Sequence, residues 1–328
     1  MIRARAPLRL DLAGGWTDVP PFSTQEGGVV VNAAIELGVE AEFEPGRAGI
    51  LILAEDLKLA ARVTAATDLQ RNGTLELHKA ALRMFPCGPG TLRTRSEVPP
   101  GSGLGSSGAL DVALVRVLTW ARGEEATAVD IAAHGWHLEA VEAGVPGGRQ
   151  DQYAAALGGF HRFSFHGEEV AVERLDLDPA FLAELERRMV ICYTGRSRVS
   201  GDTIARVMRA FESGDPAVRG ALFELRDVAD EMVAALRHGD LTRTGELLSA
   251  NWTCQQRLDP GMRTEEMAAL EAAMHGAGAV GGKAAGAGAG GSMFFLMGGD
   301  PTAGIEAAHR AGAEVLRAGW SPAGVEPC

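Results

Sequence analysis

The chain has 328 residues, which is enough for two domains, and a formal net charge of -12. That charge argues against a nucleic-acid-binding protein, because such proteins need a basic surface. No apolar run is long enough to cross a membrane, and the N-terminal residues lack the apolar stretch of a signal peptide. We therefore expect a cytoplasmic protein that binds neither nucleic acid nor membrane, and the sequence leaves a homodimer possible.

The cysteines and histidines show no metal-binding pattern. The four cysteines lie far apart without a C-x-x-C pair, which is typical of reduced thiols. None of the eight histidines stands in an H-E-x-x-H or similar spacing. We expect both residue types to be structural.

The first part of the chain is predicted to be rich in strands. Residues 1–12 alternate basic and apolar side chains and lead to Gly14 and Gly15, which indicates a strand that ends in a turn. A short helix is expected at residues 75–85. Further strands are expected at residues 28–39, 41–43, 50–54 and 92–98.

A glycine-rich loop follows at residues 99–107, with the sequence P-P-G-S-G-L-G-S-S. Alternating glycines let backbone N–H groups converge on an anion, and the apolar spacing after Ser107 predicts a helix that ends near Gly123. The N-terminus of such a helix favours phosphate. The alternative is an ordinary turn before a helix. The run is neither a Walker A sequence nor supported as a dinucleotide-binding loop.

A second group of motifs follows this helix. Thr127 and Asp130 resemble a capping box that starts a helix running to Gly144, with Glu139 and Glu142 on one face. Two glutamates on a helix are usually solvated. Asp151 then lies between two glycine pairs, a position where aspartate is more often a turn former than a catalytic group.

The remainder of the chain is predicted to form a second, α+β domain. Residues 168–178 look like a charged strand and linker, so we place the domain boundary between residues 175 and 176. A compact apolar strand is expected at residues 189–193, and a basic, glycine-rich segment leads to a helix near Thr203. The later elements are helices within residues 216–275, a glycine-rich loop at 281–292, a buried strand at 293–297 and an amphipathic helix at 302–318.

The loop P-x-x-x-G-L-G-S-S resembles the phosphate-loop motif of the GHMP kinases, the superfamily of galactokinase, homoserine kinase and mevalonate kinase. This resemblance implies an α+β fold of two domains, a ribosomal S5 domain 2-like N-terminal domain at residues 1–175 and a ferredoxin-like C-terminal domain at residues 176–328. It also implies ATP and Mg²⁺ as cofactors. The expected nucleotide-binding residues are Pro100, Gly101, Ser102, Gly103, Leu104, Gly105, Ser106 and Ser107.

Two further motifs strengthen the resemblance. The segment R-A-P-L-R-L-D-L-A-G-G-W-T-D-V-P-P is similar to the family's sugar signature, which places the motif arginine on Arg9 and the sugar-binding aspartate on Asp18. The family's Glu-His pair falls on Gly15-Trp16, which is a departure. The form G-G-W-T-D-x-P-P resembles the fucokinase branch, and G-G-x-T-D also resembles bacterial heptose 7-phosphate kinases. The neighbouring residues expected at the sugar are Gly14, Gly15, Trp16 and Thr17, with packing as an equal role for Trp16.

The run G-G-R-Q-D-Q-Y-A-A-A-L-G-G-F resembles the heptose 7-phosphate kinases most closely. It implies that Asp151 is catalytic, paired with Arg9, and that Glu139 and Ser107 hold Mg²⁺. The glycine-rich run from Lys283 is similar to the family's third motif, although Ala285 replaces the usual small hydroxyl residue. Substrate contacts are expected from Gly148, Arg149, Gln150, Gly286 and Gly288.

These motifs imply a kinase that phosphorylates the anomeric hydroxyl of a sugar, with a heptose 7-phosphate as the favoured substrate. Such a substrate needs a second anion site, for which Arg196 and Arg198 are the candidates; the alternative is that both are solvated surface charges. The second hypothesis is a free-sugar kinase of the fucokinase or galactokinase type. A third, a non-catalytic sugar and nucleotide sensor, is disfavoured because Asp151, Glu139 and Ser107 are all present.

Overall fold

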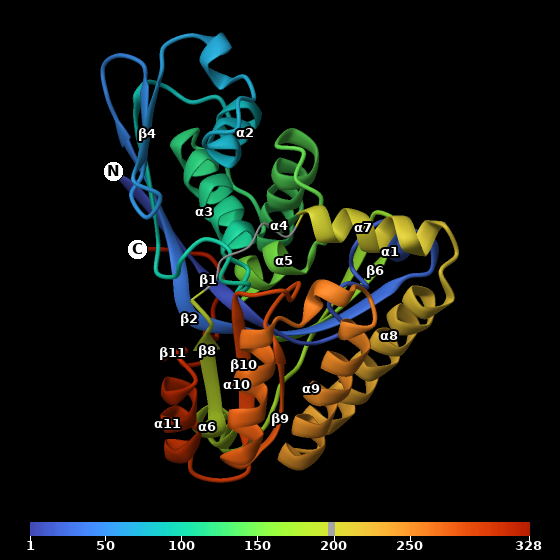
Figure 1. Cartoon of the computed structure of the whole chain (residues 1–328). Coiled ribbons are helices and arrows are strands. Elements are labelled where there is room, and N and C mark those ends of the chain that lie inside the picture. The colour runs from blue at the N-terminus through green and yellow to red at the C-terminus, as the bar shows by residue number, and fades with distance from the viewer. Residues whose placement is uncertain (196–200) are drawn as a thin grey trace.

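The computed structural model of the protein describes residues 1–195 and 201–328, and it contains two β-sheets surrounded by helices (Figure 1). The larger sheet has the strand order β12-β1-β2-β5-β3-β4, and β6 and β7 extend it from β2. Its strands are β1 (Ile2–Ala13), β2 (Gly28–Pro45), β3 (Ile50–Ala54), β4 (Leu59–Val63), β5 (Gly90–Ser96), β6 (Phe160–His166), β7 (Glu169–Arg174) and β12 (Glu326–Pro327).

The long strand β2 organises this sheet. It pairs with β1 along most of its length, with β6 through its first residues and with β5 through its last. The two segments expected at residues 28–39 and 41–43 are therefore one continuous strand. Leu8, Leu10 and Leu12 of β1 are fully buried, and Arg9 and Asp11 lie on the opposite face of the strand.

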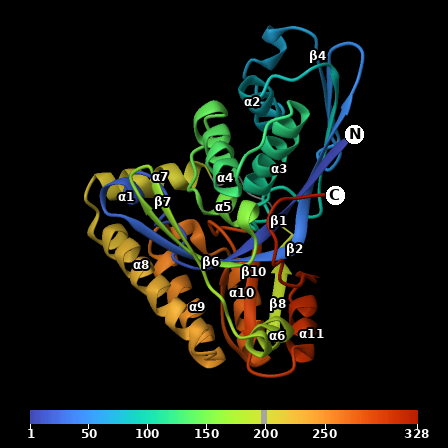
Figure 2. The ribbon, with the colours of Figure 1, turned by 180° about the vertical axis from the view of Figure 1, so that it is seen from behind.

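Helices cover both faces of the larger sheet. Figure 1 shows α2 to α5 above it and α8 (Pro216–Arg237) and α9 (Leu241–Gln256) below, and Figure 2 shows the same layers from behind. Helices α3, α5, α8 and α9 contact β1, and α3, α5 and α8 also contact β2. The helices of the first layer are α2 (Glu76–Met84), α3 (Ser106–Ala121), α4 (Ala128–His137) and α5 (Gln150–Leu157); the short α1 (Phe22–Gln25) contacts β6.

The second sheet is antiparallel, with the order β11-β8-β10-β9. Its strands are β8 (Met189–Tyr193), β9 (Ala279–Ala284), β10 (Ser292–Met297) and β11 (Glu314–Leu316). The helices of this part are α6 (Pro179–Arg188), α7 (Gly201–Glu212), α8 (Pro216–Arg237), α9 (Leu241–Gln256), α10 (Glu265–Gly276) and α11 (Thr302–Arg310). The α+β class expected from the sequence is confirmed. Of the described helices, none is both long and apolar enough to span a membrane.

Two expectations about this second part are wrong. The helix predicted over residues 302–318 ends at Arg310, because Gly312 adopts a φ of +82° and the chain then pairs with β8 as β11. The loop predicted from residue 281 begins after Ala284. Gly281 and Gly282 belong to β9, where a Cβ would lie 1.7 Å from the Gly245 carbonyl oxygen and 2.2 Å from the Phe295 ring respectively. These glycines allow close packing rather than a turn.

The chain ends on the first sheet rather than the second. Residues Glu326 and Pro327 pair with Arg5 and Ala4, so both termini lie at the same edge in Figure 1. The last strand of the first sheet before this return, β7, ends at Arg174, and the second sheet begins at Met189. The domain boundary between residues 175 and 176 stays a prediction, and the C-terminal tail crosses it.

Candidate active site

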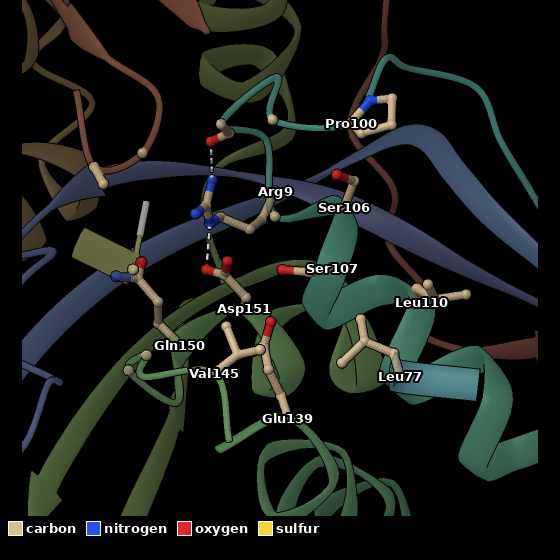
Figure 3. A pocket seen from close by; sticks show the side chains of 18 of the residues that line it. Arg9, Leu77, Pro100, Ser106, Ser107, Leu110, Glu139, Val145, Gln150 and Asp151 are labelled. Atoms are coloured by element: carbon tan, nitrogen blue, oxygen red, sulfur yellow. Dashed lines mark hydrogen bonds and ion pairs between the residues drawn. The ribbon is translucent and has the colours of Figure 1, made fainter. Parts of the chain in front are cut away.

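A cavity of about 410 Å³ lies where the larger sheet, the loop before α3 and the N-terminal ends of α5 and α7 meet (Figure 3). Its two ends differ in chemistry. Figure 3 shows Leu77 and Leu110 on one side of the cavity and Gln150 on the other, and Gln150 binds Asp18, which also lines the cavity. The expected site residues that line the cavity are Arg9, Gly15, Trp16, Asp18, Pro100, Gly101, Gly103, Gly105, Ser106, Ser107, Glu139, Gly148, Gln150, Asp151 and Gly286.

The glycine-rich loop has the conformation that an anion cradle needs. Gly101, Gly103 and Gly105 have φ values of +73°, +79° and +79°, which residues with a Cβ rarely adopt. Gly105 is the N-cap of α3, so the free N–H groups of the first turn of α3 lie at the cavity. Ser102 points away and is fully buried, and its carbonyl accepts a hydrogen bond of 2.7 Å from the backbone N–H of Ser292. The loop is thus braced by the second sheet.

Arg9 and Asp151 form an ion pair at the centre of the cavity. Arg9 Nε donates to Asp151 Oδ1 over 2.8 Å, and Arg9 Nη1 donates to the carbonyl oxygens of Gly103 and Ala285 over 2.7 and 2.9 Å (Figure 3). Both glycine-rich loops therefore hold Arg9 in place, and Arg9 in turn holds the Asp151 carboxylate next to the phosphate loop. Gly108 permits this approach, because a Cβ there would lie 2.6 Å from that of Asp151.

Glu139 enters the cavity from a π-helical turn, Leu138–Glu142, that follows α4. The helix begins with the expected capping box of Thr127 and Asp130. In the wider turn, residues three apart no longer share a face. Glu142 therefore does not line the cavity with Glu139 and instead accepts a hydrogen bond from Arg83. The expectation that the two glutamates lie on one face is wrong.

Burial and the nearby Asp151 raise the pKa of Glu139 to about 7, opposed by hydrogen bonds from Ser107 and Gln152. Gln152 Nε2 donates to Glu139 Oε2 over 2.7 Å and to Asp111 Oδ2 over 3.3 Å. Asp111 is fully buried, and burial together with the charge of Glu139 raises its pKa well above the usual range. The protein thus holds three carboxyl groups close together, those of Asp111, Glu139 and Asp151.

The donor set fits Mg²⁺ bound together with a nucleotide. Within residues 1–195 and 201–328, no group of three or more His, Cys, Asp or Glu side chains could hold a metal by itself. Mg²⁺ is usually bound by one or two protein carboxylates, substrate phosphates and waters. The Ser107 hydroxyl and the adjoining Glu139 carboxylate supply two hard oxygen donors next to the phosphate loop, which suits that pattern.

Asp18 occupies the polar end and is held by Gln150. The Gln150 backbone N–H donates to Asp18 Oδ2 over 3.0 Å, and its side-chain Nε2 donates to Oδ1 over 3.1 Å. Burial raises the pKa of Asp18 to about 6, although the hydrogen bond from the Gln150 backbone N–H opposes the rise. Gly148 makes the arrangement possible, because a Cβ there would lie 1.9 Å from Asp18 Oδ2.

The turn that carries Asp18 is held rigidly. The Thr17 hydroxyl oxygen lies 2.7 and 2.9 Å from the carbonyl oxygens of Gly14 and Val29 and accepts a hydrogen bond from the Val29 N–H over 3.0 Å. The Gly14 N–H donates to Asn251 Oδ1 over 2.9 Å. Trp16 lines the cavity and also packs in a buried apolar cluster with Phe22, so both roles considered for its side chain remain compatible with the structure.

Two models of known protein families match the chain. The model described as GHMP kinases N terminal domain matches residues 70–159, and the one described as GHMP kinases C terminal matches residues 232–317. The D-glycero-alpha-D-manno-heptose 7-phosphate kinase of Campylobacter jejuni is 30% identical over 309 residues, which are 92% of this chain and 90% of that protein. The chain belongs to the GHMP kinase family.

Other relatives of this GHMP kinase include further sugar kinases and mevalonate kinases. The bifunctional fucokinase/GDP-fucose pyrophosphorylase of Arabidopsis thaliana is 28% identical over 279 residues. These residues make up 79% of this chain and 26% of that protein. A crystal structure titled D-glycero-D-manno-heptose 1-phosphate kinase, from Bacteroides thetaiotaomicron, has a TM-score of 0.80 and 26% identity and covers 100% of this chain and 99% of that one. The galactokinase of Lactococcus lactis, with a TM-score of 0.80, 20% identity and coverage of 99% and 94%, shows the shared fold.

Several expected residues of the GHMP kinase lie outside the cavity lining. Gly14 and Thr17 support the turn, Ser102 and Leu104 face the protein interior, and Gly288 packs against Met262. Arg149 is buried, with its guanidinium carbon 4.4 Å from the centre of the Trp136 ring. Arg196 and Arg198 fall outside the described residues.

Sequence reasoning missed three buried polar residues of the site, Asp11, Asp111 and Gln152. Asp11 lines the cavity and binds Lys283, which the sequence singled out only as the start of a loop. Its position two residues after Arg9 on a strand was a signal that both share a face. Asp111, an acidic residue among the apolar positions of α3, was a comparable signal.

Proposed function

We propose that this GHMP kinase transfers the γ-phosphoryl group of ATP to the anomeric hydroxyl of a heptose 7-phosphate, giving a heptose 1,7-bisphosphate. The observation that carries the proposal is the position of the Arg9–Asp151 pair. It lies in one cavity between the N-terminus of α3, which suits phosphates, and Asp18, which suits sugar hydroxyls. Phosphoryl transfer depends mainly on such positioning and on charge neutralisation.

Each side chain has a distinct role in this mechanism. Asp151 accepts a hydrogen bond from the attacking hydroxyl and directs its oxygen toward the γ-phosphorus, and takes the proton as the new bond forms. Arg9 holds the Asp151 carboxylate in place and adds positive charge beside the transferred group. The loop from Pro100 to Ser107 binds the phosphates through its N–H groups.

Ser107 and Glu139 would hold Mg²⁺, which would supply positive charge to neutralise the phosphates. The Glu139 carboxylate must be deprotonated to bind the ion, so its raised pKa of about 7 couples metal binding to the release of a proton. The apolar end of the cavity, with Leu77 and Leu110, suits the nucleoside base.

The acceptor is assigned to the polar end. Asp18 accepts hydrogen bonds from sugar hydroxyls there, and Trp16 provides an apolar ring surface for the sugar. The relative named as a heptose 7-phosphate kinase, which aligns with 92% of this chain, supports a phosphorylated heptose as acceptor. We assign the second anion site to Arg196 and Arg198, with Arg149 as a further candidate.

A free-sugar kinase is the second candidate function. It is favoured by the fucokinase relatives and by Trp16 beside Asp18 in the cavity. A third acceptor comes from the structural neighbour that is named a heptose 1-phosphate kinase. These candidates differ in which hydroxyl receives the phosphate and in whether the acceptor already carries one.

A ³¹P NMR experiment separates the three acceptors. The protein is incubated with Mg·ATP and, in parallel, heptose 7-phosphate, heptose 1-phosphate or free L-fucose. The proposal predicts a new anomeric phosphate signal beside a retained 7-phosphate signal only in the first sample. Turnover of free sugar alone would support the second candidate, and turnover of the 1-phosphate alone would reverse the order of phosphorylation.

The Arg196→Ala variant tests the second anion site. It is expected to raise the KM for heptose 7-phosphate by about 10- to 100-fold, because a charge-assisted contact is lost, and to leave the KM for ATP within about twofold. Equal losses for both substrates would overturn the assignment. We further assign the protein to the cytoplasm, where ATP is available and its free cysteines stay reduced.

A further inference from the structure

A buried ion pair joins the two sheets at the wall of the cavity, which Asp11 lines. Lys283 Nζ lies 2.8 Å from Asp11 Oδ2 and donates to the backbone carbonyl of Asp11 over 2.5 Å. The Lys283 side chain is fully buried and that of Asp11 is 3% exposed. Asp11 belongs to β1 of the larger sheet and Lys283 to β9 of the smaller one.

Asp11 lies two residues from Arg9 itself, and Lys283 lies two residues from a backbone contact of Arg9. Asp11 follows Arg9 on the same face of β1, and Lys283 precedes Ala285, whose carbonyl accepts a hydrogen bond from Arg9. The side chains of Arg9 and Asp11 thus form two adjacent links between β1 and the segment from Lys283 to Ala285. A shift of one link displaces the other, because both act on the same two backbone segments.

Asp11 also holds the turn that leads to Asp18. The Gly15 backbone N–H donates to Asp11 Oδ1 over 3.3 Å, and a Cβ on Gly15 would lie 2.0 Å from Asp11 Oδ2. One carboxylate therefore contacts the smaller sheet through one oxygen and the turn through the other. The turn to Asp18 and the β1 segment that carries Arg9 thus share this carboxylate as a support.

Stability alone does not explain a pair of this kind. Removing two charges from water costs free energy that their attraction often fails to recover, and well-packed apolar residues frequently replace buried ion pairs without loss. The Lys283 ammonium is also 5.7 Å from the centre of the Phe294 ring. What the pair adds over an apolar contact is a fixed direction and distance between two backbones.

We propose that Asp11 and Lys283 are a positioning pair for catalysis, which sets Arg9 and the Gly15–Asp18 turn relative to the phosphate loop without touching either substrate. This inference rests on the proposed phosphoryl transfer. Removal of the pair is therefore expected to lower kcat and to weaken binding of the acceptor, but not binding of the nucleotide. The phosphate loop keeps its own support, the bond between the Ser292 N–H and the Ser102 carbonyl.

The test compares two neutral double variants. Asp11→Asn/Lys283→Met removes the ion pair and leaves no unpaired charge, so it is expected to fold. The control, Arg162→Met/Asp230→Asn, removes an ion pair of the same length, 2.8 Å, that joins β6 to α8 away from the cavity. We expect the first variant to lose about 10- to 100-fold in kcat and to raise the acceptor KM, with the KM for Mg·ATP within about threefold. The control should change none of these by more than about twofold. Wild-type kcat and acceptor KM in the first variant would overturn the proposal.

Hydrogen exchange gives a readout that needs no acceptor. Faster amide exchange is expected at residues 13–19 and 284–291 in the Asp11→Asn/Lys283→Met protein and not in the control. If the wild type phosphorylates none of the three acceptors, the proposed function fails, and the exchange data still decide whether the pair holds these segments. Exchange that matches the control would overturn the proposal. Should the double variant not fold, the isosteric Asp11→Asn variant is measured against Asp230→Asn by the same criteria.

Discussion

Arg9 Nε and Asp151 Oδ1 are 2.8 Å apart although 142 positions separate the two residues in the chain. The contact brings the first strand of the larger sheet to the first turn of α5, directly beside the phosphate loop. In the proposed mechanism it joins Asp151, which orients the attacking hydroxyl, to Arg9, which balances charge. The predictions below follow from this pair and from the carboxylates around it.

The variant Asp151→Asn is expected to lower kcat by about 10²- to 10⁴-fold, because the amide cannot accept the proton of the attacking hydroxyl. The KM for ATP should change little, since the phosphate-binding loop is held by the bond between the Ser292 N–H and the Ser102 carbonyl. Steady-state kinetics with the acceptor identified by NMR provide the measurement. Circular dichroism verifies the fold, and a kcat within threefold of the wild type would remove Asp151 from the mechanism.

The variant Gly148→Ala is expected to raise the acceptor KM by at least about tenfold, because its methyl group would occupy the position of an Asp18 carboxylate oxygen. The KM for ATP should stay near the wild-type value. Gly276→Ala is the matched control, since a Cβ on Gly276 has no neighbour within 4 Å and its φ is not positive. An unchanged acceptor KM in the Gly148→Ala variant would show that Asp18 does not bind the acceptor.

The acceptor KM is expected to depend on the protonation of Asp18, whose pKa burial raises to about 6. Below this pH the carboxyl carries a proton and loses one site that accepts hydrogen bonds, so the acceptor KM should rise as the pH falls from 7 to 5. The Asp18→Asn variant should lose this dependence and keep a high KM throughout. Initial rates at saturating Mg·ATP across this pH range provide the measurement, and parallel profiles for the two proteins would contradict the assignment.

Glu139 is expected to control the affinity for Mg²⁺. Because its pKa is raised to about 7, protons compete with the ion, and the apparent affinity should fall by about tenfold for each pH unit below 7. Glu139→Gln should weaken Mg²⁺ binding and abolish this pH dependence. Titration of activity with Mg²⁺ at fixed ATP, from pH 6 to 8, measures both effects, and an unchanged Mg²⁺ requirement in Glu139→Gln would exclude the ligand role.

The raised pKa of Glu139 also predicts how the stability of the metal-free protein depends on pH. The folded-state pKa of Glu139 lies above its ordinary value of 4.5, so protonation stabilises the fold fully below about pH 4.5. This contribution is lost as the pH rises through about 7. The Tm of the metal-free wild type should therefore fall relative to that of Glu139→Gln between pH 5 and pH 8. A constant difference in Tm would show that Glu139 is not buried as described.

Asp111 is expected to tolerate an amide. Burial beside Glu139 raises its pKa well above the usual range, so the fold favours its protonated form, which asparagine resembles. Asp111→Asn should match or exceed the wild-type Tm, and its advantage should grow with rising pH. Gln152→Leu is the contrasting variant, because it removes the donor that lies between Asp111 and Glu139 and should lower the Tm. A stable Gln152→Leu protein with normal Mg²⁺ affinity would contradict this account.

The local parts of the site could be predicted from the sequence because their causes are local. Three alternating glycines, all at positive φ, and the apolar spacing after Ser107 determine a loop that opens onto a helix. Thr127 and Asp130 form the expected capping box, and the strands at residues 50–54 and 189–193 lie where apolar runs predicted them.

Prediction failed where distant contacts override local pattern. Residues 302–318 have the spacing of one helix, but Gly312 ends it and pairing with β8 turns the remainder into a strand. Gly281 and Gly282 look like loop residues, and only the neighbouring Gly245 and Phe295 show why a strand contains them. The π-helical turn that separates Glu139 from Glu142 is likewise invisible in the residue spacing.

By itself, the sequence determined that a phosphate loop, a motif arginine and a candidate catalytic aspartate exist, because each depends on a few consecutive residues. Only the tertiary structure decided that Arg9 reaches Asp151, that Gln152 joins Asp111 to Glu139, and that Asp11 binds Lys283 across 272 positions. The physical reason is that these contacts depend on how two sheets and their helices pack together, and the spacing of residues along the chain does not contain that information.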